Sequence, residues 1–106
     1  MSEPQELLGS AREAAAFLKV LSNEHRLMIL CLLAEGERTV SELEAALGLR
    51  QPTLSQQLAR LRTEDLVDPR RDGKSIYYSL ANPEVRQIVT VLHDMFCVSG
   101  ASRAHS

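Results

Sequence analysis

Hydrophobic residues recur at helical spacing along most of the chain. A stripe of leucines and alanines predicts a helix over residues 6–21, with residues 1–5 frayed. Residues 24–34 are apolar on every side around the segment LMILCLL, which is typical of a buried helix. A last stripe begins at Asn82-Pro83-Glu84, which supplies a cap, a first-turn proline and a first-turn acid, and it extends to Phe96.

The segment TVSELEAALGLRQPTLSQQLARLR between these helices predicts two short helices joined by a glycine turn. Thr39 and Glu42 have the spacing of a capping box, in which each side chain bonds to the backbone of the other residue. Gly48 follows the first short helix, where a residue with positive φ often ends a helix. Pro52 stands in the first turn of the second, where proline is well tolerated. The buried stripe of that second helix consists of Leu54, Leu58 and Leu61.

Two strand-like runs surround Asp72-Gly73, a dipeptide that is typical of tight hairpin turns. We expect strands over residues 67–71 and 74–80, with a basic tip. A helix-turn-helix followed by a basic hairpin is the pattern of a winged helix-turn-helix. The predicted fold is therefore mainly α with a small β-hairpin, in the order of four helices, two strands and a fifth helix.

The polar face of the second short helix, from Pro52 to Thr63, indicates DNA binding. Gln and Arg have the forked geometry that reads base edges in a major groove, and wing cations suit phosphates or a narrow minor groove. Double-stranded operator DNA is therefore the expected partner, and an ordinary solvated helix face is the alternative. The residues expected to contact DNA are Gln51, Thr53, Ser55, Gln56, Arg60, Arg70, Arg71 and Lys74.

The net charge of −2 conceals an uneven distribution. Residues 50–74 carry six cations against four anions, whereas the remaining residues carry six against ten. The positive charge lies where DNA would bind, and this local field matters more than the total. We expect modest non-specific affinity with a strong dependence on salt.

Composition and length predict one domain. Charged residues make up 25% and hydrophobic residues 44%, as in soluble globular proteins. No apolar run is long enough for a membrane span and no signal peptide is visible, so we expect a cytoplasmic protein without a membrane partner. Residues 1–98 are assigned to the winged helix-turn-helix domain and residues 99–106 to a disordered tail. The first and last helices have little core left to cover, so they are expected to pair in a homodimer.

Two cysteines, Cys31 in the buried helix and Cys97 at the end of the last helix, are the remaining candidate chemistry. Both suit small buried hydrophobes, and a structural disulfide is not expected in the cytoplasm. His25, His93 and His105 are scattered, so neither a metal site nor a cofactor is predicted, although His93 and Cys97 have the spacing of a His/Cys pair. No set of nucleophile and base is visible, and an enzyme is not expected.

From about Ala14 to Cys97 the chain resembles the ArsR family of bacterial winged-helix repressors. The matching stretches are LSNEHRLMILCLLAEGERTVSELEAALGL, QPTLSQQLARLRTEDLV and RRDGKSIYYSL. The segment ILCLL around Cys31 and the segment LHDMFC ending at Cys97 resemble the sulfide-responsive, SqrR/BigR-type branch. This resemblance implies a homodimer that binds operator DNA while both thiols are reduced. Persulfides or polysulfides would then bridge the two cysteines within a subunit and release the DNA.

Two positions bear on the branch and on base preference. Val40-Ser41-Glu42 stands where metal-sensing branches have cysteines, and Gln57 stands where many members have histidine. The alternatives left open are a metal- or peroxide-responsive repressor, a small thiol oxidoreductase, and a winged helix that binds only proteins.

Overall fold

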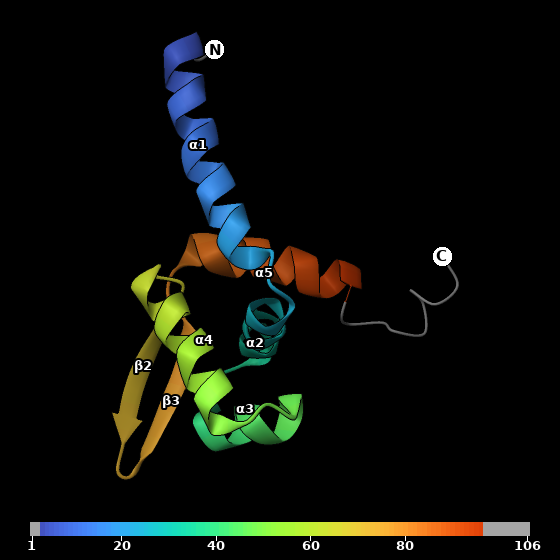
Figure 1. Ribbon diagram of the computed structural model, residues 1–106, viewed down its shortest axis with the longest axis vertical. Coiled ribbons are helices and arrows are strands. Elements are labelled where there is room, and N and C mark those ends of the chain that lie inside the picture. The colour runs from blue at the N-terminus through green and yellow to red at the C-terminus, as the bar shows by residue number, and fades with distance from the viewer. Residues whose placement is uncertain (1–2, 97–106) are drawn as a thin grey trace, which may run out of the picture.

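The computed structural model describes residues 3–96, so Cys97 and the expected tail at 99–106 lie outside the described residues. Five helices and a three-stranded sheet confirm the expected mainly helical winged helix-turn-helix (Figure 1). No helix in this described part combines the length and the hydropathy that a membrane span requires. The elements are α1 (Pro4–Leu21), α2 (Glu24–Glu35), β1 (Arg38–Thr39), α3 (Val40–Leu47), α4 (Gln51–Thr63), β2 (Val67–Asp72), β3 (Ser75–Leu80) and α5 (Pro83–Phe96).

The sheet differs from the expected hairpin by one additional strand. Strand β1 pairs antiparallel with β3, with Arg38 opposite Tyr78 and Thr39 opposite Tyr77, and the strand order is β1-β3-β2. A strand of two residues is too short to show any alternation of polar and apolar positions. The long-range pairing with β3 creates β1, and no local pattern predicts it.

The hairpin turn lies one residue later than expected. Asp72 pairs with Ser75, so Gly73 and Lys74 form the two-residue loop and Asp72 belongs to β2. Gly73 has φ of 63°, as a tight hairpin turn that matches the strand twist requires. Lys74 therefore lies at the tip of the wing, where its side chain is exposed.

The first helix begins earlier than expected. The sequence predicted frayed residues 1–5 and a helix from residue 6, whereas α1 begins at Pro4.

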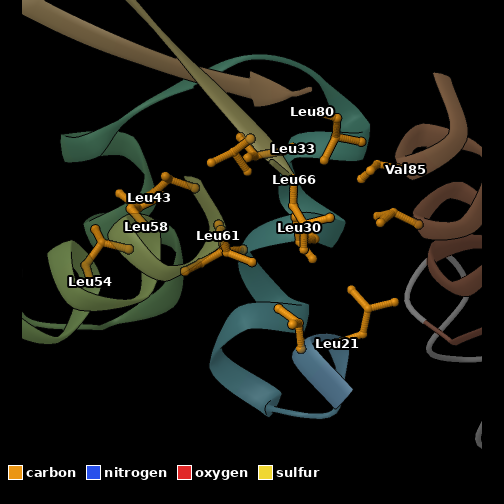
Figure 2. Packing of buried hydrophobic residues seen from close by; sticks show 14 residues of the cluster. Leu21, Leu30, Leu33, Leu43, Leu54, Leu58, Leu61, Leu66, Leu80 and Val85 are labelled. Atoms are coloured by element: carbon orange, nitrogen blue, oxygen red, sulfur yellow. The ribbon is translucent and has the colours of Figure 1, made fainter. Parts of the chain in front are cut away.

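Helix α2 lies at the centre of the hydrophobic core. It packs against all four other helices and against β3, and its residues Ile29 and Leu30 are fully buried. Figure 2 shows Leu43, Leu54 and Leu58 on the side of α3 and α4, and Val85 toward α5. The apolar character of residues 24–34 thus reflects neighbours on nearly every side of one helix.

The start of α3 carries the predicted capping box. The Thr39 hydroxyl accepts a hydrogen bond from the Glu42 backbone N–H at 3.1 Å, and the Glu42 carboxylate accepts one from the Thr39 N–H at 2.8 Å. The hydrogen bond from the Thr39 backbone N–H to the carboxylate is the main cause of the lowered pKa of Glu42, and the Thr39 side chain adds to it. Gly48 ends the helix with φ of 67°, the left-handed conformation that the sequence predicts. Local hydrogen bonds therefore fix both ends of this short helix.

Helices α1 and α5 expose large apolar side chains. Most of α1 extends away from the rest of the molecule (Figure 1), and only Val20 and Leu21 at its end are buried. The stripe expected to line α1 is thus largely open to solvent in the single chain. The exposed large apolar residues of the two helices are Leu7, Leu8, Leu18, Ile88, Val91, Met95 and Phe96.

The capping box makes a first prediction about stability. Replacing Thr39 by alanine removes the acceptor for the Glu42 N–H, and the free energy of unfolding should fall by about 1 kcal/mol. Urea denaturation at fixed protein concentration measures this difference. Thr63→Ala at the exposed end of α4 is the matched control and should be nearly neutral, so an equal effect of both substitutions would contradict the role of the cap.

Candidate nucleic-acid interface and sensing thiol

Helix α4 presents a polar face to solvent because its leucines fill the core. Leu54, Leu58 and Leu61 are buried and fix the rotation of the helix about its axis. On the other side, the Gln51 amide donates to the Ser55 hydroxyl at 3.4 Å. Of the predicted contacts on this helix, Gln51, Ser55, Gln56 and Arg60 are exposed, whereas Thr53 is half-buried.

Arg70 on the wing is held by neighbouring side chains. Its guanidinium forms two hydrogen bonds with the Glu37 carboxylate, at 3.0 and 2.7 Å, and lies 4.8 Å above the ring centroid of Tyr77. Asp72 adds a contact at 3.7 Å. The hydrogen bonds raise the pKa of Arg70 and lower that of Glu37, so both groups are charged at neutral pH. Of the three wing cations, Arg70 is therefore the one whose positive charge is already balanced by nearby carboxylates.

Arg71 and Lys74 are the exposed cations of the wing. Neither forms an ion pair with a residue of the described part of the chain. Lys74 also borders a polar cleft of about 340 Å³ that joins the wing tip to the starts of α3 and α4. This cleft places the wing and the exposed start of α4 on one continuous surface. Its lining residues are Thr39, Val40, Ser41, Gln51, Lys74, Ser75 and Ile76.

Gln57 faces α2, unlike its neighbour Gln56. Its amide oxygen accepts a hydrogen bond from Arg26 Nη1 at 3.3 Å, and Arg26 Nε donates to the Val20 carbonyl at 2.7 Å. Arg26 therefore ties α4 to the end of α1. The sequence does not reveal this contact, because Arg26 and Gln57 are 31 positions apart.

Cys31 is buried in α2, with 7% of its surface exposed. Glu35 lies one turn later on the same helix, and its carboxylate contacts His93 Nε2 of α5 at 2.7 Å. Helical geometry therefore places Cys31 near the side of α2 that faces α5. Cys97, the other predicted sensing residue, lies outside the described residues, so its position relative to Cys31 is not part of this geometry. Within residues 3–96, no three His, Cys, Asp or Glu side chains are arranged to hold a metal.

His93 is the ionisable group on α5 that faces α2, with 12% of its side chain exposed. Its hydrogen bond to Glu35 raises its pKa, partial burial opposes this, and a contact with Asp94 at 3.4 Å adds to the rise. The charged imidazolium is therefore favoured to higher pH than in an exposed histidine. The attraction between α2 and α5 at this point weakens as pH rises through that raised pKa.

Helices α3 and α4 followed by the basic hairpin of β2 and β3 are the arrangement of a winged helix-turn-helix DNA-binding protein. Residues 23–68 match the model of the arsR family of bacterial regulatory proteins. The chain belongs to this family, and it is a transcriptional regulator rather than an enzyme.

Similar proteins include both repressors and an activator. The biofilm growth-associated repressor of Agrobacterium fabrum is 49% identical over 87 residues, which are 82% of this chain and 74% of that protein. The transcriptional activator HlyU of Vibrio cholerae is 40% identical over 93 residues, 88% of this chain and 86% of that protein. The crystal structure of the repressor BigR from Xylella fastidiosa covers 92% of this chain and 96% of its own, with 43% identity and a TM-score of 0.87.

The two exposed wing cations lead to a prediction about salt dependence. Neutralising Arg71 and Lys74 together as Arg71→Gln and Lys74→Gln should weaken binding to all DNA sequences alike. The slope of log K against log salt should fall by about 0.9 for each phosphate contact removed. Fluorescence anisotropy over a salt series measures the slope. Arg12→Gln with Lys19→Gln on α1 removes the same charge far from the wing (Figure 1), and an equal effect there would contradict the assignment.

Proposed function

We propose that this chain is a cytoplasmic, homodimeric repressor that binds operator DNA through α4 and the wing and is released by reactive sulfur. In this proposal, persulfides or polysulfides bridge Cys31 and Cys97 within one subunit. The observation that carries it is that Cys31 is buried in α2 one helical turn before Glu35, whose carboxylate contacts His93 of α5. Cys97 directly follows Phe96, the last residue of α5.

The comparisons support a thiol-dependent regulator of this type. BigR and the Agrobacterium protein are named as repressors. A structure of HlyU from Vibrio cholerae is named as its reduced form, and it superposes with a TM-score of 0.83 over 88% of this chain. That a reduced form of HlyU is distinguished by name is consistent with cysteine redox chemistry in this group of proteins.

The proposed reaction is a pair of thiol–polysulfide exchanges. One thiolate attacks a sulfur atom of a hydrogen polysulfide, an S–S bond of the polysulfide breaks, and a shortened polysulfide leaves with the electron pair. The second thiolate attacks the inner sulfur of the chain now attached to the first cysteine and expels the terminal sulfur as hydrosulfide. Both thiols are oxidised, the expelled sulfur is reduced, and the thiol protons pass to the leaving sulfur species.

The requirement for Cys31 gives the test of this function. Polysulfide should release reduced wild-type protein from the DNA upstream of its own gene, by about 5- to 150-fold in affinity. Cys31→Ser should bind this DNA when reduced and stay bound after treatment. Anisotropy with intact mass on the same sample records release together with the sulfur added between Cys31 and Cys97. Release of the Cys31→Ser protein would contradict the proposal, and a simple disulfide of two oxidised thiols would favour a peroxide-responsive repressor.

The exposed apolar residues of α1 and α5 support the homodimer. A partner subunit that covers these helices would remove Leu18 and Val91, which are 56% and 55% exposed in the single chain, from water. Burial of apolar surface is the main favourable term in such association. A two-fold dimer would place two copies of α4 at half-sites about one helical turn of DNA apart.

A charge on α5 should therefore dissociate the dimer. Val91→Glu introduces a carboxylate without a partner into the proposed interface, and the dissociation constant should rise by at least about 100-fold. Sedimentation equilibrium measures this constant. Arg86→Gln, an exposed polar change on the same helix, is the control. A Val91→Glu protein that remains dimeric at wild-type concentrations would place the interface elsewhere.

A further inference from the structure

The carboxylate of Glu35 contacts both the last helix and the sheet of the wing. Its Oε2 atom lies 2.7 Å from His93 Nε2 on α5, and its Oε1 atom lies 3.5 Å from Arg38 Nη2 on β1. Glu35 is the last residue of α2, so both contacts form where this buried helix ends. The Glu35 side chain therefore contacts both α5 and β1.

Strand β1 and the residue before it contact the two long strands of the wing. Arg38 is paired with Tyr78 of β3, and the adjacent Glu37 forms two hydrogen bonds with Arg70 of β2. Arg70 in turn lies over the ring of Tyr77 on β3. Residues 35–38 thus contact α5 on one side and both long strands of the wing on the other.

The connection between α2 and β1 is short and conformationally demanding. Gly36 has φ of 150°, a conformation that side chains rarely adopt, and a Cβ atom there would lie 3.1 Å from Arg38 Nη1. Only Gly36 and Glu37 separate the two elements. A displacement of the end of α2 therefore reaches β1 through two residues and cannot be absorbed by a long loop.

We propose that Glu35 is a positioning residue that couples the last helix to the wing. A change in the position of α5 at its C-terminal end moves His93, and Glu35 and Arg38 transmit this movement to the hairpin that carries Arg70 in β2 and Lys74 in its loop. The charged groups that face His93 are Glu35 and Asp94, with Arg38 on the far side of the Glu35 carboxylate. The regulatory use of this coupling rests on the proposed sulfur switch, but the coupling itself is a property of the reduced protein.

Nuclear magnetic resonance on the full-length reduced protein tests the coupling without sulfur. His93→Asn should shift the backbone amide signals of Tyr77 and Tyr78 and the Nε signal of Arg70. The same substitution in a Glu35→Ala background should leave these signals where Glu35→Ala alone puts them. Shifts of equal size in both backgrounds, or no shift of the wing signals in either, would overturn the proposal.

The DNA-release experiment tests the regulatory consequence. Glu35→Ala should keep the reduced operator affinity within about twofold of wild type. The ratio of affinities before and after polysulfide should fall by about two- to tenfold. Glu24→Ala, at the exposed start of the same helix, is the control and should leave the ratio unchanged.

The two measurements separate the two hypotheses. An unchanged ratio in Glu35→Ala protein, with wild-type release intact, would overturn the regulatory coupling. If polysulfide fails to release the wild-type protein, the proposed function fails, and the resonance experiment alone decides whether Glu35 couples α5 to the wing.

Discussion

The burial of α2 is the constraint on which the rest of the structure depends. Ile29, Leu30 and Leu33 are almost inaccessible to solvent, and every other helix packs on this one. Because a close-packed core has few alternative arrangements, the other elements take their positions from α2. The rotation that exposes the polar face of α4 follows from packing its leucines into the core that α2 centres. The sensing thiol proposed for Cys31 lies in the same helix, within the least adaptable part of the molecule.

Sequence reasoning succeeded where the cause of a structure is local. The capping box of Thr39 and Glu42 involves residues three positions apart, and both of its hydrogen bonds form as predicted. The same holds for the left-handed Gly48 and for the buried stripe of α4. It failed by one residue at the wing tip, because Asp72-Gly73 and Gly73-Lys74 both suit a tight turn and only the strand register decides between them.

Long-range pairs account for what the sequence did not predict. Strand β1 exists because β3 lies beside it, and Arg70 is paired with Glu37, 33 positions away. The sequence suggested three equivalent wing cations, whereas the structure holds one of them against acids and an aromatic ring. The inward direction of Gln57 has the same origin, because its partner Arg26 lies on another helix. Nothing in the local sequence of these residues carries a signal of such contacts.

The two ends of α2 make polar contacts with different elements of the molecule. At its start, Arg26 joins the end of α1 to α4, and at its end Glu35 joins α5 to the sheet. A rigid buried helix with polar contacts at both ends can transmit a shift without changing its own packing, because its apolar faces stay in place. Exposed ion pairs contribute little individually, so an allosteric effect of ordinary size must draw on several of them at once. In the proposed dimer, a sulfur bridge at Cys31 would act between these two ends of α2. A displacement of α5 would then reach the wing and, through the proposed interface of α1 and α5, the spacing of the two copies of α4.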